Sequence, residues 1–123
     1  MREIPYNYTS ADDQQIVRFL FDPETWTRLE QLRAKRVTGR SARLLMRVIG
    51  DLFVLRRNTF LLQDLLDNPG RQKDFFDDIR SELDTVRTGA ANNQDVLQIL
   101  DRCDRLARKT EESLAHAPSR QAA

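Results

Sequence analysis

Apolar residues recur three and four positions apart along most of this chain, and this spacing restricts the fold more than any other feature of the sequence. One clear series runs through Phe75, Phe76, Ile79, Leu83 and Val86. No stretch alternates polar and apolar residues for long enough to predict a strand, and we find no internal repeat. The sequence therefore predicts an all-α fold, a compact bundle of about five to six helices with an extended N-terminal arm.

Capping signals divide the chain into the predicted helices. Asp22-Pro23 and Asn68-Pro69 each pair a capping side chain with a proline suited to the first helical position. Gly39 is expected to end one helix, and Ser41 to cap the next. The predicted helices cover about 10–21, 23–36, 41–57, 60–66, 69–88 and 94–115.

Two positions carry specific expectations for packing. Trp26, Leu29 and Leu32 form an apolar stripe that is expected to face the core. Gly50 lies inside the helix predicted to be central, where glycine costs about 1 kcal/mol relative to alanine. We therefore expect another helix to cross closely at Gly50.

The predicted organisation is an arm over residues 1–9, one helical domain over 10–116 and a flexible tail over 117–123. A length of 123 residues and an apolar content of 40% suit a single folded domain. Pro5 disfavours helix in the arm, where Tyr6 and Tyr8 are candidate docking residues. These tyrosines can equally pack onto the helices of their own domain.

The chain is expected to be cytoplasmic and to lack a membrane span. Its longest mostly apolar run, 44–55, is broken by Arg47 and Asp51 and is shorter than the roughly 20 residues that a span requires. The N-terminus also lacks the apolar stretch of a secretory signal.

Charge is distributed unevenly although the net charge is only +1. Residues 28–57 contain nine Lys and Arg against two acids, whereas residues 58–116 contain eight against twelve. Such a basic segment can form a phosphate or nucleic-acid surface, or it can face the acids of neighbouring helices. Both interpretations remain open at this stage.

The turn around Gly39 is the candidate anion-binding site. Gly39, Arg40, Ser41 and Arg43 lie at a predicted helix start, where backbone amides attract anions and guanidinium groups bind them bidentately. The alternative is an ordinary helix stop whose arginines pair with acids elsewhere in the domain.

No catalytic residue and no metal-binding residue is predicted, and no cofactor is expected in this chain. His116 is the only histidine, and the only cysteine, Cys103, lies on an apolar stripe where it should behave as a small buried hydrophobe. Neither a nucleophile–histidine pair nor a zinc site of the usual Cys/His type can be assembled from these residues.

Three sequence strings resemble a known family: Arg2 to Ser10 (REIPYNYTS), Arg36 to Arg43 (RVTGRSAR) and Leu65 to Pro69 (LLDNP). They are similar to the uncharacterised helical N-terminal domain of large bacterial FAD-linked oxidoreductases of the glycolate or D-lactate dehydrogenase type. The resemblance covers about residues 2–88 and fades after Gly89. It implies FAD and iron–sulfur clusters in a parent or partner enzyme, not in this chain, and no catalytic residue carries over.

The sequence thus favours a non-catalytic accessory or docking domain associated with such an oxidoreductase. The chain is then either one module of a longer polypeptide or a free-standing relative that binds a separate protein. The alternative is a stand-alone helical nucleic-acid-binding or regulatory protein that uses the basic segment 28–57. The apolar residues between 44 and 55 do not suit a DNA recognition helix, so nucleic acid is the less favoured partner.

Overall fold

The computed structural model describes residues 11–89 and 93–115, with side chains from Gln14 onward. Within these ranges the chain forms six α-helices and no strand, so the predicted all-α bundle is confirmed. The helices are α1 (Ala11–Leu20), α2 (Pro23–Arg33), α3 (Gly39–Arg57), α4 (Thr59–Asp67), α5 (Pro69–Gly89) and α6 (Gln94–Ala115). Tyr6, Tyr8, His116 and the predicted arm and tail lie outside the described residues.

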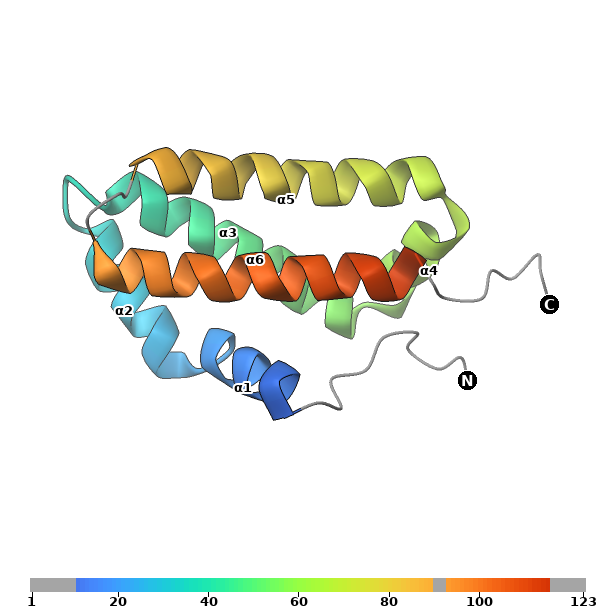
Figure 1. Ribbon diagram of the computed structural model, residues 1–123, viewed down its shortest axis with the longest axis horizontal. Coiled ribbons are helices and arrows are strands. Elements are labelled where there is room, and N and C mark those ends of the chain that lie inside the picture. The colour runs from blue at the N-terminus through green and yellow to red at the C-terminus, as the bar shows by residue number, and fades with distance from the viewer. Residues whose placement is uncertain (1–10, 90–92, 116–123) are drawn as a thin grey trace.

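The two longest helices, α5 and α6, run antiparallel and side by side along the bundle (Figure 1). The predicted central helix is confirmed as α3, which packs against α2, α4, α5 and α6. The short α1 packs on α6 and α2, and the short α4 connects α3 to α5. All six helices contribute to one apolar core, in which Cys103 is fully buried as predicted.

Side-chain caps begin three of the helices. The amide of Glu24 donates to Asp22 Oδ1 at 2.8 Å, which confirms the predicted cap of α2. Asn58 Oδ1 accepts from the first amides of α4, and Asn93 Oδ1 accepts from the amide of Val96 at 3.0 Å. These local hydrogen bonds satisfy amides that the helices leave unpaired, which explains why sequence signals located the helix starts.

The junction between α2 and α3 differs from the prediction. Helix α2 ends at Arg33, and α3 begins at Gly39. Gly39 therefore starts a helix instead of ending one, and the proposed cap residue Ser41 lies inside α3. At this junction the hydroxyl of Thr38 donates to the carbonyl of Leu32 at 2.6 Å and satisfies an acceptor at the end of α2, so Thr38 ties the start of α3 to α2.

Two packing predictions were wrong. Trp26 is 38% exposed, and Thr25 is buried in its place because its hydroxyl donates to the carbonyl of Phe19 at 2.6 Å. Helix α2 thus turns residues 25, 29 and 32 toward the core instead of 26, 29 and 32. At Gly50 no helix crosses closely, since an added Cβ would meet nothing within 4 Å.

None of the helices described is both long enough and apolar enough to cross a membrane.

Candidate functional site

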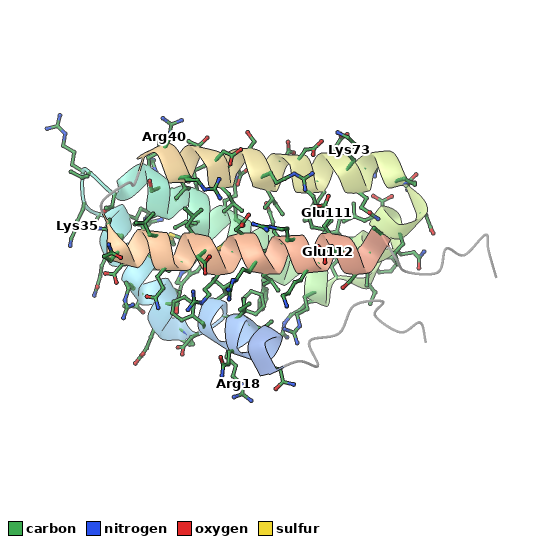
Figure 2. The ribbon with its side chains drawn as sticks, viewed as in Figure 1. Arg18, Lys35, Arg40, Lys73, Glu111 and Glu112 are labelled. Carbon is green, nitrogen blue, oxygen red and sulfur yellow. The ribbon has the colours of Figure 1, made fainter. Side chains whose placement is uncertain are left out.

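Five basic side chains gather where the end of α2 meets the start of α3. They line an open concave surface of about 620 Å³, together with Ala34 and Gly39. We call this surface the basic corner, formed by Arg33, Lys35, Arg36, Arg40 and Arg43. Figure 2 shows Lys35 and Arg40 projecting from this end of the bundle.

Gly39 makes the basic corner possible by allowing a close approach of the backbone. A Cβ at this position would lie 2.8 Å from the carbonyl oxygen of Arg33, a separation that real side chains essentially never show. Because Gly39 has no Cβ, the first turn of α3 can contact the last residue of α2. The basic residues on both sides of the turn therefore share one surface.

No ion pair neutralises the charge of the basic corner among the described side chains. Residues 31–50 contain no Asp or Glu. In the part of the chain whose side chains are described, none of the five basic side chains forms a hydrogen bond or an ion pair. The start of α3 adds further positive potential, since its first turn has no acid and Thr38 does not cap it with its side chain.

Other cations of the segment 28–57 do have partners. Arg28 lies 3.6 Å from Asp95 of α6, and Arg47 lies 3.7 Å from Glu82 of α5. The Arg57 guanidinium lies over the Phe53 ring, 4.7 Å from its centroid. Pairing with neighbouring helices therefore holds for Arg28 and Arg47, and the basic corner carries the excess charge.

The structure brings together three of the four predicted anion-binding residues. Gly39, Arg40 and Arg43 line the basic corner. Ser41 does not, because it is buried and its Oγ faces Gly89, 3.6 Å from where a Cβ there would lie. The prediction also lacked Arg33, Lys35 and Arg36, which reach the same surface because α2 ends beside the start of α3. Anion binding by these residues stays a prediction.

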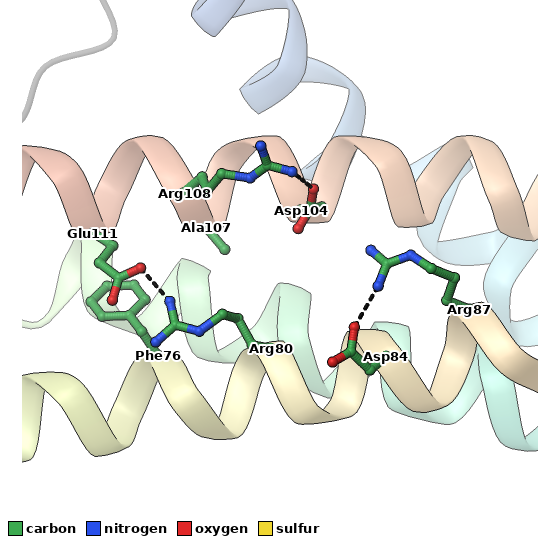
Figure 3. Close-up of a pocket in the computed structure, with 8 residues that line it drawn as sticks. All are labelled: Phe76, Arg80, Asp84, Arg87, Asp104, Ala107, Arg108 and Glu111. Atoms are coloured by element: carbon green, nitrogen blue, oxygen red, sulfur yellow. Dashed lines mark hydrogen bonds and ion pairs between the residues drawn. The ribbon is translucent and has the colours of Figure 1, made fainter.

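A second charged surface, between α5 and α6, has the opposite character. This charged cleft, of about 560 Å³, is lined by Arg80, Arg87, Arg108, Asp84, Asp104 and Glu111 over the buried Phe76 and Ala107 (Figure 3). Each of its arginines forms an ion pair with an acid of the same cleft. Only the pair between Arg80 and Glu111 joins the two helices. The cleft is therefore internally neutralised.

The family described as "Protein of unknown function (DUF3683)" matches residues 1–112. The chain belongs to the DUF3683 family. The match includes the N-terminal arm, the basic corner and α6 as far as Glu112, and so extends past Gly89, where the resemblance to oxidoreductase N-terminal domains fades. No curated protein and no solved structure matches the chain.

Elsewhere in this DUF3683 domain, burial changes the chemistry of three ionisable side chains. It raises the pKa of the Cys103 thiol, so this sulfur stays protonated and is a poor nucleophile. Desolvation also raises the pKa of Asp51 and of Glu82, and the positive charge of Arg47 opposes both shifts. Glu82 Oε2 is buried and has no hydrogen-bond partner in the described part of the chain. Among the described residues, no three His, Cys, Asp or Glu side chains gather as potential metal ligands.

Proposed function

We propose that this DUF3683 domain is a non-catalytic docking module that binds an acidic surface of a protein through the basic corner. The observation that carries this proposal is the gathering of five basic side chains with no acid partner among the described residues. Guanidinium groups bind carboxylates bidentately and lose less hydration than ammonium groups do. Four of the five basic side chains are arginines, which suits a protein partner rich in Asp and Glu.

We propose further that the partner is an FAD-linked, iron–sulfur-containing oxidoreductase. The support is the sequence resemblance in the strings 2–10, 36–43 and 65–69, of which the second contributes Arg36, Arg40 and Arg43 to the basic corner. The docking contact is then either between two polypeptides or between modules of one. Blotting of source-cell extract with an antibody against this domain separates these cases, since a free chain runs near 14.4 kDa.

Charge reversal at one arginine tests the docking surface. We expect Arg40→Glu to weaken binding to the purified flavin-containing protein by about tenfold or more, since the reversed charge repels an acidic partner by at least 1.4 kcal/mol. Binding is measured by biolayer interferometry at two salt concentrations.

The matched control for this experiment is Arg18→Glu. Arg18 is an exposed arginine on α1 without an ion pair among the described side chains, and it lies well away from Arg40 (Figure 2). The control makes the same charge change at a different place. Equal loss of affinity in both variants would mean that net charge, not the basic corner, governs binding, and would refute the proposal.

Nucleic-acid binding is the second candidate function, because five cations without an ion pair in the described part of the chain also suit a phosphate backbone. The apolar side chains of α3, including Leu45, Val48 and Leu52, are buried, so such binding would read backbone and not bases. With about five phosphate contacts, affinity should fall roughly two to three orders of magnitude between 50 mM and 200 mM salt. No binding of a labelled duplex at the lower salt concentration excludes this function.

A further inference from the structure

An apolar groove lies where the connection between α1 and α2 meets the middle of α3. Its volume is about 250 Å³, and its lining includes Phe21, Asp22, Trp26, Ile49, Gly50 and Phe53. Trp26 is 38% exposed and Phe53 is 39% exposed, so two large aromatic rings that would gain from burial remain partly in water. Pockets for small molecules usually measure about 300 to 1,000 Å³, so this groove suits one or two side chains of another protein better than a free ligand.

Gly50 forms the floor of the groove without a side chain. A glycine inside a 19-residue helix destabilises that helix relative to alanine, and a closely packed neighbour usually accounts for it. Among the described residues there is no such neighbour, since a Cβ at Gly50 would meet nothing within 4 Å. The wall beside the floor is well formed, because the Phe21 and Phe53 rings pack edge to face with centroids 5.3 Å apart. Gly50 therefore leaves room for the close approach of a partner.

The groove and the basic corner open on the same side of the pair formed by α2 and α3. On α2, Trp26 of the groove and Arg33 of the corner are seven residues apart, and on α3 the same separation holds for Gly50 and Arg43. Seven residues make almost two helical turns, so each pair lies on one face of its helix. The start of α2 lies against the middle of α3, and its end lies against the start of α3. The groove and the corner are therefore the two ends of one shared face.

The exposed face of α3 has the residue spacing of a surface on which a second helix packs. Arg43, Met46, Gly50 and Phe53 follow one another at intervals of three, four and three residues. Met46 is partly buried against the core and lies between the corner and the groove. A glycine in such a series allows the two helix axes to come close together. Along α3, Gly50 and Arg43 are about 10 Å apart at about 1.5 Å per residue.

The charge differs between the two ends of this shared face. Arg33, Arg40 and Arg43 contribute positive charge at the corner. Asp22 lies at the groove, and Glu30 is exposed on α2 between the two ends. Acidic side chains of a partner are therefore repelled at the groove and at the middle of the face, and are attracted at the corner. The complementary segment carries an apolar side chain at one end and acids only about two turns away.

We propose that the acidic partner docks through an amphipathic helix that lies along α2 and α3. A large apolar side chain of this helix occupies the groove over Gly50, and its acidic side chains bind the basic corner about two turns away. This proposal rests on the docking function proposed above and adds to it the chemistry of the segment that is bound. The apolar anchor then buries Trp26, and the acids fix the direction of the bound helix.

Selection from a peptide display library tests the proposal, with the full chain as the bait. Peptides of about four helical turns span both surfaces, since the groove and the corner are about two turns apart. The framework of the peptides is helical, and the positions on one face are varied among apolar, acidic, basic and neutral residues. We expect the enriched peptides to carry one large apolar residue and a group of acids centred about seven residues from it.

The other outcomes of the selection overturn the proposal in distinguishable ways. Acids enriched without an apolar residue at a fixed distance would leave docking at the basic corner intact and would remove the groove from it. Apolar residues enriched without acids would contradict both the proposed segment and the docking function. A library without any enriched peptide would exclude a helical segment as the occupant, while charge reversal at Arg40 would still decide the docking function.

Two glycines provide matched variants for the most enriched peptide. Gly50→Leu fills the groove and should weaken peptide binding about tenfold or more, measured by fluorescence anisotropy. Gly70→Leu should leave binding unchanged, because a Cβ at Gly70 also meets nothing within 4 Å but this residue lies in the first turn of α5, outside the groove. Circular dichroism verifies that both variants keep their helix content. Equal affinity of Gly50→Leu and the wild type would contradict the assigned position of the apolar side chain.

Trp26 reports directly on the groove, because it is the only tryptophan in the sequence. Binding of an enriched peptide that lacks tryptophan should shift the emission of Trp26 to shorter wavelength and reduce its quenching by acrylamide. The same peptide with alanine in place of the apolar anchor should bind more weakly and leave the emission unchanged. Unchanged emission at saturation with the complete peptide would show that the groove stays empty, and would overturn the proposal even if the acids bind the corner.

Discussion

The charged cleft and the basic corner are both rich in arginine, yet only the cleft contains its own counter-charges. Arg87 and Arg108 pair with acids three or four residues away on the same helix, and Arg80 also reaches across to Glu111. At the basic corner no described acid pairs with the basic side chains, since residues 31–50 contain no acid and Glu30, three residues before Arg33 on α2, forms no ion pair with it. Arginine density alone therefore does not mark a binding surface, because the charge of an arginine is available to a partner only where no neighbouring acid pairs with it.

Neither surface contributes much to the stability of the fold. Exposed ion pairs such as those of the cleft contribute about 0.2 to 1 kcal/mol each, and unpaired exposed cations contribute nothing favourable. We expect the two surfaces instead to affect how stability depends on salt and how strongly the domain attracts acidic partners. Four substitutions test the contrast between the two surfaces and the packing around them.

The largest effect is expected from Gly39→Ala, which disturbs the basic corner through its backbone. The new Cβ would lie 2.8 Å from the Arg33 carbonyl, so α2 and α3 must separate, at a cost of about 1 to 3 kcal/mol. Urea denaturation measures this loss. The control is Gly50→Ala, which meets no atom within 4 Å and should raise stability by about 0.5 to 1 kcal/mol. Effects of equal sign would contradict the close approach at Gly39.

A smaller effect is expected from Arg80→Ala in the charged cleft. The change removes the pair with Glu111 between α5 and α6, and should lower the free energy of unfolding by about 0.2 to 1 kcal/mol, less at high salt. Arg40→Ala at the basic corner should leave stability unchanged or slightly higher, since it removes only like-charge repulsion. Thermal unfolding at low and high salt compares the stability of the two variants. An equal loss of stability in both would show that the charged cleft and the basic corner do not differ in their ion pairing.

Glu82 of α5, which lies 3.7 Å from Arg47 of α3, predicts a dependence of stability on pH. Burial raises the pKa of Glu82, so the folded state holds its proton more tightly than the unfolded chain does. The stability linked to this group is fully present below its ordinary pKa of 4.5 and is lost as the pH rises through the higher folded-state pKa.

Glu82→Gln should therefore match the wild type near pH 4 and be more stable at pH 7, by less than about 1 kcal/mol because one oxygen remains near Arg47. Urea denaturation of both proteins at the two pH values measures the difference. A variant that is less stable than the wild type at pH 7 would show that the pair with Arg47 outweighs the burial of the carboxylate.

The smallest effect on stability is expected from Val37→Glu, which supplies the acid that the basic corner lacks. Val37 is 85% exposed, so no core contact is lost. The new carboxylate should raise stability by a few tenths of a kcal/mol and should weaken binding to an acidic partner. Val37→Gln is the uncharged control. If both variants bind the partner equally, the charge of the basic corner is not what the partner recognises.

Local signals in the sequence were sufficient for the helices but not for their rotation. The positions of α1 and α6 agreed with the predicted 10–21 and 94–115 within one residue, because caps and apolar spacing act over only a few residues. For α2 the residues 26, 29 and 32 and the residues 25, 29 and 32 fit helical spacing equally well. The hydrogen bond from Thr25 to Phe19 comes from packing against the end of α1 and selects the second set.

The candidate site was predictable only in part for a related reason. Gly39, Arg40 and Arg43 stood out as a short string, whereas Arg33 and Lys35 belong to the preceding helix and its connector. Their shared surface depends on how closely the two helices approach, which Gly39 permits and spacing does not reveal. The apolar groove was missed because Trp26, Gly50 and Phe53 each looked like core.

The amino-acid sequence was sufficient to predict the helices, most of their limits, a single apolar core and the excess of basic residues in segment 28–57. These follow from interactions among residues a few positions apart and from composition. Which cations pair with an acid became clear from the fold, since Arg28 and Arg47 pair with acids of α6 and α5 and the basic corner has no acid partner among the described residues. Such pairing acts over a few ångströms between helices far apart in the chain, so it depends on how the helices pack.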